Sequence, residues 1–116
     1  MPTSVSGENR LKRLIDFISE NYTNDISLEE IAVVAAMTPN SFCRFFKSRT
    51  NKTAFQFINE YRISKACQML INGEESISKI CFEAGFNSFS SFNRTFKKYK
   101  KISPGEFKDK YRGLSK

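Results

Sequence analysis

The chain contains no histidine and no tryptophan, and only three of its 116 residues are cysteine. Without an imidazole, Cys43, Cys67 and Cys81 have no partner for a zinc site or for a cysteine–histidine nucleophile, and they form no C-x-x-C pair. No paired carboxylates suited to acid–base catalysis stand out either. We therefore predict that the chain is not an enzyme and that it holds no metal ion and no cofactor.

The sequence also lacks a long apolar run and a secretory signal peptide. A membrane-spanning helix needs about 20 apolar residues, so we expect no contact with a membrane. Three cysteines are an odd number and do not form a disulfide framework. The sequence therefore predicts a protein of the reducing cytoplasm.

Phenylalanine and basic residues are abundant instead: 12 residues are Phe, and the net charge is +7. Residues 38–65 carry six Lys or Arg against one acid, and residues 88–112 carry eight against two. The rest of the chain is mildly acidic. Two basic blocks separated by acidic segments indicate a polyanionic partner with a periodic structure. The alternative is that these lysines and arginines only lie on solvated helix faces and have no such partner.

One pattern occurs twice along the chain. Residues 31–37 and 42–47 (IAVVAAM and FCRFFK) return as residues 80–86 and 92–97 (ICFEAGF and FNRTFK), offset by 49 and 50 residues. Each copy predicts a short apolar helix, a tight turn, and a second helix carrying Arg and Lys. This is the outline of a helix-turn-helix, whose second helix enters the major groove of DNA.

Capping signals predict where the helices begin. Ser27 with Glu30, Thr53 with Gln56, and Ser103 with Glu106 have the spacing of capping boxes. Thr38 and Ser103 are each followed by proline, which favours the first helical position. Asn51, Gly73 and Gly85 are suited to helix ends. The predicted helices are 9–22, 27–36, 39–50, 54–72, 76–84, 88–100 and 104–112.

We therefore predict an all-α fold of about seven helices, with two helix-turn-helix subdomains joined by a long linker helix. Residues 1–8 are small and polar and are expected to be a flexible tail or the remnant of a linker. The expected boundaries are 9–52 for the first unit, 53–72 for the linker helix and 73–113 for the second unit.

The second helix of each unit has one apolar side, with Phe42, Phe45 and Phe46 in the first unit and Phe92 and Phe96 in the second. Arg44 and Arg94 lie on the other side at equivalent positions and are the best candidates to bond guanine, as Asn93 is for adenine. Phe89 can meet a thymine methyl or fold into the core, and the two arginines can pair with acids instead. The candidates for DNA phosphate are Thr38, Ser41, Lys47, Ser88, Lys97, Lys98 and Lys101.

These residues resemble the DNA-binding domain of the AraC/XylS transcription regulators. The resemblance covers about residues 9–112. Its most specific part comprises Ala84-Gly85-Phe86, Phe92, Phe96-Lys97, Ser103-Pro104 and Phe107, and Arg62, Ala66 and Leu70 match the linker helix. The chain departs from the family at Cys81, where Ala is usual, and at Asn51, where Gly is common.

The resemblance implies two units joined by a rigid helix that read two major-groove segments. It also implies transcriptional control, more often activation, through RNA polymerase. By position, the base-reading residues would be Asn40, Cys43, Arg44, Phe89, Ser90, Asn93 and Arg94. Because other residues often stand where this chain has Asn40 and Cys43, the target bases do not carry over. An effector site and a dimerisation partner would lie in a missing N-terminal domain if the chain is a fragment.

The sequence thus predicts specific binding of double-stranded DNA over roughly 20 bp, by recognition helices at about 39–50 and 88–100. The alternatives are a basic helical protein-interaction module and a non-specific nucleic-acid binder. The Arg and Lys residues recur at matching positions in the two copies of the repeat, and this disfavours the protein-interaction module. Binding of RNA is disfavoured because the aromatic residues are spaced as helix core.

Overall fold

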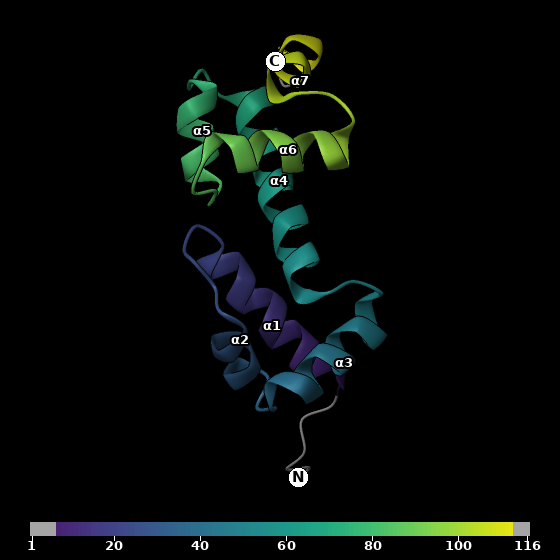
Figure 1. The fold of residues 1–116 in the computed structure, drawn as a ribbon. Coiled ribbons are helices and arrows are strands. Elements are labelled where there is room, and N and C mark those ends of the chain that lie inside the picture. The colour runs from purple at the N-terminus through teal and green to yellow at the C-terminus, as the bar shows by residue number, and fades with distance from the viewer. Residues whose placement is uncertain (1–6, 113–116) are drawn as a thin grey trace. The chain divides into compact units, whose positions relative to one another are not determined.

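The computed structural model describes residues 7–112 and contains seven α-helices and no strand within this range (Figure 1). The predicted all-α class is confirmed. The helices are α1 (Gly7–Asn21), α2 (Leu28–Val34), α3 (Pro39–Thr50), α4 (Ala54–Asn72), α5 (Ile77–Glu83), α6 (Phe89–Lys100) and α7 (Pro104–Tyr111).

The chain divides into two compact units, Met1–Ile58 and Asn59–Lys116. The division falls inside α4, whose first turn contributes buried Ala54 and Ile58 to the first unit. The remainder of α4 contributes Ile63 and Leu70 to the core of the second unit. A helix with buried residues in both units needs apolar residues on more than one side, as its sequence has.

The helices begin where the sequence places their caps. The hydroxyl of Ser27 accepts a hydrogen bond from the Glu30 amide (3.0 Å), and the Glu30 carboxylate accepts one from the Ser27 amide (2.9 Å). Thr53 with Gln56 and Ser103 with Glu106 make the same reciprocal pairs. All three predicted capping boxes are therefore confirmed. Each satisfies backbone amides that the first helical turn leaves without a partner.

Within residues 7–112, four residues with positive φ form two equivalent pairs. Ala36 (φ 57°) and Gly85 (φ 99°) occupy the turn between the two helices of each unit, and Asn51 (φ 64°) and Lys101 (φ 73°) end the second helices. In both turns the chain closes with matching bonds, from the Met37 amide to the Ala32 carbonyl and from Phe86 to Cys81 (3.0 and 3.1 Å). The repeat in sequence is thus a repeat in backbone conformation.

Two helix ends differ from the sequence prediction by two residues, and six others differ by one. α1 begins at Gly7, two residues earlier than expected, with Glu8 in its first turn, where a negative charge is favourable. Gly7 and Glu8 therefore do not belong to a tail, while residues 1–6 and 113 lie outside the described range. α2 ends at Val34 and not at Ala36, because Ala36 has left the right-handed helical conformation.

Candidate nucleic-acid interface

α3 has one buried side and one exposed side. The rings of Phe42 and Phe46 are completely buried. The side chains on the other side are exposed, and among the candidate residues they are Asn40, Cys43, Arg44 and Lys47. Their spacing of three and four residues puts them on neighbouring positions of one helix face. The sequence prediction of this face is confirmed for exposure, and its contact with bases stays a prediction.

α6 repeats this arrangement in the second unit. Phe92 and Phe96 are completely buried, and Arg94 is exposed. Phe89 is 47% exposed, with its ring centroid 6.2 Å from that of Phe92, so it lies largely outside the core. Asn93 is half-buried. The remaining candidates of this unit are exposed: Ser88, Ser90, Lys97, Lys98 and Lys101.

The capping hydroxyls at the two recognition helices are already engaged. Thr38 Oγ1 accepts the Ser41 amide at 3.3 Å, and Ser88 Oγ accepts the Ser91 amide at 3.1 Å. α3 begins with Pro39, which has no backbone N–H group, whereas α6 begins with Phe89, which has one. A phosphate at α6 would therefore meet more backbone donors than one at α3.

Phe45 is the one residue of the predicted apolar side that is not fully buried. It is half-buried, and two guanidinium groups lie by its ring, Arg10 at 5.9 Å and Arg49 at 5.2 Å from the centroid. The Nε atom of Arg10 is buried and has no hydrogen-bond partner. Sequence reasoning missed this cation–π cluster, because nothing in the local pattern reveals that α1 brings Arg10 to α3.

The three cysteines occupy different environments. Cys67 and Cys81 are buried, and burial raises the pKa of both thiols. The Cys81 thiol donates to the Ser88 carbonyl, with the sulfur 3.5 Å from the oxygen, which joins α5 to the cap of α6. Cys43 is exposed on α3 and is the accessible thiol of the described chain.

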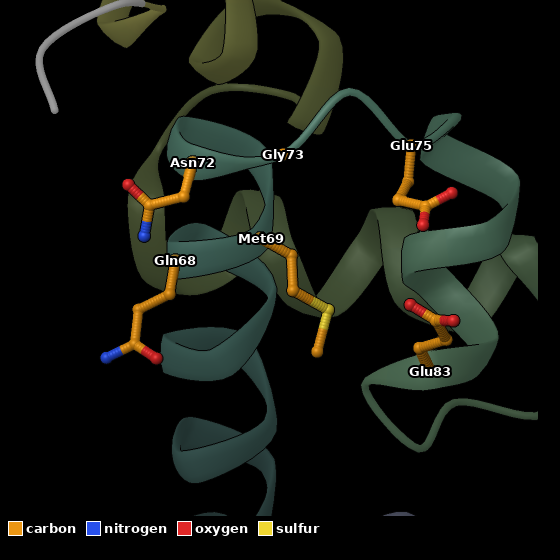
Figure 2. A pocket seen from close by; sticks show the side chains of 6 residues that line it. All are labelled: Gln68, Met69, Asn72, Gly73, Glu75 and Glu83. Carbon is orange, nitrogen blue, oxygen red and sulfur yellow. The ribbon is translucent and has the colours of Figure 1, made fainter. Parts of the chain in front are cut away.

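One cavity of the second unit has no lining residue on α6. It has a volume of about 360 Å³ and is lined by Gln68, Met69, Asn72, Gly73, Glu75 and Glu83, from the end of α4 and from α5 with the loop before it (Figure 2). Its only charged lining groups are carboxylates. An anion is therefore disfavoured here, and the cavity does not extend the predicted phosphate-binding surface.

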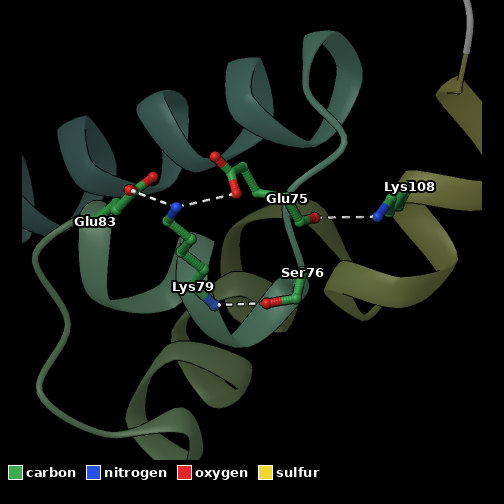
Figure 3. A network of polar contacts seen from close by, with 5 residues as sticks. All are labelled: Glu75, Ser76, Lys79, Glu83 and Lys108. Atoms are coloured by element: carbon green, nitrogen blue, oxygen red, sulfur yellow. Dashed lines mark hydrogen bonds and ion pairs between the residues drawn. The ribbon is translucent and has the colours of Figure 1, made fainter.

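A polar network holds the start of α5 beside this cavity (Figure 3). Lys79 Nζ lies 3.2 Å from a Glu75 oxygen and 4.0 Å from a Glu83 oxygen, and the hydrogen bond to Glu75 is the main cause of its raised pKa. Lys108 donates to the Glu75 carbonyl at 3.2 Å. Lys79 is thus paired with carboxylates, and Lys108 is hydrogen-bonded to a backbone carbonyl.

Between residues 7 and 112, no group of three or more Cys, Asp or Glu residues is placed to hold a metal ion. None of the helices in that range combines the length and the apolar character that a membrane crossing requires.

Comparison with known proteins identifies the family. The model of a family described as "Helix-turn-helix domain" matches residues 31–110. An uncharacterized HTH-type transcriptional regulator of Bacillus subtilis, YdeC, is 31% identical over 100 residues, which are 86% of this chain and 34% of that protein. The HTH-type transcriptional activator RhaS of Mannheimia succiniciproducens is 29% identical over 101 residues, 87% of this chain and 38% of RhaS. The chain spans little more than a third of the length of either relative.

The fold is shared with solved structures of the same type. The DNA-binding domain of AdpA, a global transcriptional factor crystallised with a target DNA, superposes with a TM-score of 0.84 at 23% identity, over 90% of this chain and 95% of that one. The two helix-turn-helix units, the linking helix α4 and the match over residues 31–110 agree with the resemblance seen in the sequence. The chain belongs to the AraC-type helix-turn-helix family.

Proposed function

We propose that the chain binds double-stranded DNA sequence-specifically and is the DNA-binding part of a transcription regulator. In this proposal α3 and α6 enter successive major grooves of a site of about 20 bp. One observation carries the proposal. Each compact unit exposes an arginine at the same repeat position, opposite two fully buried phenylalanines, on a helix whose flanking lysines are also exposed.

The assignment of individual contacts follows from the chemistry of these side chains. The base-reading residues are Asn40, Cys43, Arg44, Phe89, Ser90, Asn93 and Arg94. Arg44 and Arg94 can each bond guanine through two nitrogens, and the exposed ring of Phe89 suits a thymine methyl. The phosphate contacts are Thr38, Ser41, Lys47, Ser88, Lys97, Lys98 and Lys101, which position the helices without reading sequence.

The regulatory part of the proposal rests on the relatives. RhaS is named a transcriptional activator and AdpA a transcriptional factor, which supports activation as the outcome of DNA binding. RNA polymerase is then the expected protein partner, and the cytoplasm the expected location. An effector site and a dimer interface would belong to a further domain, and we propose no catalytic activity.

The experiment is selection of binding sites from a pool of random DNA duplexes with this chain, at about 0.15 M salt. Two enriched blocks with centres about one helical turn (~34 Å) apart are expected. A single block would mean that one unit reads bases while the other holds the backbone. Salt-sensitive binding without enrichment would favour the non-specific alternative, and absence of DNA binding would leave the protein-interaction alternative.

A further inference from the structure

A small cavity in the first unit lies beside Cys43. It has a volume of about 100 Å³ and is lined by Leu28, Cys43, Thr53, Ala54 and Phe55. Leu28 begins α2, and the last three residues belong to the cap and the first turn of α4. Phe55 is 45% exposed, and Cys43 and Thr53 are exposed, so three of the lining residues are also part of the surface.

The lining leaves no polar side-chain group in need of a ligand. Thr53 supplies the only side-chain oxygen, and this atom accepts the Gln56 amide at 3.1 Å. The Thr53 amide in turn donates to Gln56 Oε1 at 2.9 Å. The other four side chains offer methyl groups, a ring and a thiol, which is a weak hydrogen-bonding group. An apolar occupant is therefore favoured over a polar one.

The volume restricts what this occupant can be. Sites for small organic ligands and cofactors measure about 300–1,000 Å³, so a cavity of about 100 Å³ is too small for an effector of that kind. It is large enough for a methyl group and the edge of the ring that carries it. A single small apolar group attached to a larger partner fits both the size and the chemistry.

The position of Cys43 indicates which partner carries this group. Cys43 lies three residues after Asn40 and four before Lys47, on the face of α3 that the proposed function directs to the bases. The surrounding segment 38–65 is strongly basic, which complements DNA. In the major groove, the C5-methyl of thymine is the apolar group that base edges present.

We propose that the cavity formed by Cys43, Phe55 and their neighbours receives the C5-methyl group of one thymine in the DNA block read by the first unit. This inference rests on the proposed function and adds to it a base identity and a further contact residue, Phe55. Cys43 and Phe55 select thymine over cytosine by contact with the methyl group.

The test uses the duplex obtained from the selection experiment and replaces each thymine of the first block, one at a time, by uracil. Uracil keeps every base-pairing group and lacks only the methyl group. The ratio of the Kd with uracil to the Kd with thymine therefore measures the contribution of the methyl group to binding. One position is expected to lose about fourfold in affinity, the value for burial of one methyl. In Cys43→Ser and Phe55→Ala this ratio should fall toward one at that position.

Ser48→Ala is the matched control, because Ser48 lies on α3, is exposed, and bonds only the Phe45 carbonyl. The uracil-to-thymine Kd ratio of Ser48→Ala should equal that of the unmodified chain. Circular dichroism should show the same helix content for all variants. The proposal is overturned by a first block without thymine, by uracil ratios of one throughout, or by a methyl effect that persists in both cavity variants. Failure of the proposed function would show earlier, as failure to select any site.

Discussion

Arg44 and Arg94 occupy equivalent positions, and each is exposed on a helix whose opposite side carries two fully buried rings. Replacing either by alanine should cost about 1–3 kcal/mol of binding free energy on the selected site and relax discrimination at one base pair. Fluorescence anisotropy on the selected and on random duplexes measures both effects.

Arg49→Ala is the control for this pair, because the Arg49 guanidinium lies over the Phe45 ring and not on the proposed reading face. The binding free energy that Arg49→Ala loses should be equal on selected and random DNA. If Arg44→Ala and Arg94→Ala also lose the same binding free energy on selected and random DNA, neither residue reads bases.

Lys97 represents the proposed phosphate contacts of the second unit. It is exposed in the last turn of α6, and its positive charge also lowers the pKa of the Glu106 carboxyl. Lys97→Ala should weaken binding to all sequences alike and reduce the slope of log K against log salt by about one. Lys12→Ala removes a lysine that pairs with Asp16 at 3.0 Å on α1, and should leave the slope unchanged. An unchanged slope in Lys97→Ala would exclude the phosphate contact.

At the level of helices and turns, the sequence predicted the seven helices closely, because the signals are local. Capping boxes, proline at a first helical position and the spacing of apolar residues each act within a few residues. The left-handed conformations of Ala36 and Lys101 were not predicted, since neither residue type favours them. The half-buried ring of Phe45 lies 5.9 Å from the guanidinium of Arg10 on another helix, a contact that the local sequence pattern does not reveal.

The two inter-helix turns give a matched pair of substitutions. Gly85→Ala puts a Cβ on a residue with φ 99° and should destabilise the second unit by about 1–2 kcal/mol. Ala36→Gly removes the same strain at φ 57° in the first unit, and should stabilise that unit by less than about 1 kcal/mol, because glycine gains entropy in the unfolded chain. Urea unfolding measures both, and the same sign in the two variants would contradict the equivalence of the turns.

The cap of α7 makes stability depend on pH. The Ser103 amide and then its hydroxyl hold the pKa of the Glu106 carboxyl below its ordinary value. This stabilisation is complete above the carboxyl's pKa in the unfolded chain and is lost as the pH falls through the lower folded value. Glu106→Gln keeps an acceptor for the capping box and cannot titrate. As the pH falls through the pKa of the carboxyl, the stability of this variant in urea should fall less than that of the unmodified chain, and parallel profiles would contradict this role.

At the scale of the whole molecule, the repeat predicted two units, and the structure divides between Ile58 and Asn59 inside α4. The long helix that was predicted to join the units contributes buried residues to both, in agreement with its apolar positions on more than one side. The candidate reading faces followed from helical spacing and were predictable. Which bases these faces meet was not predictable, because Cys43 forms no unique hydrogen-bonding pair with a base.

The central claim is that the two units read two separate blocks of one DNA site. The most direct measurement scrambles each block of the selected duplex in turn and determines Kd for the unmodified chain, Arg44→Ala and Arg94→Ala. Arg44→Ala is expected to lose sensitivity to one block only, and Arg94→Ala to the other only. If both variants lose sensitivity to the same block, or keep sensitivity to both, the two units do not read separate blocks.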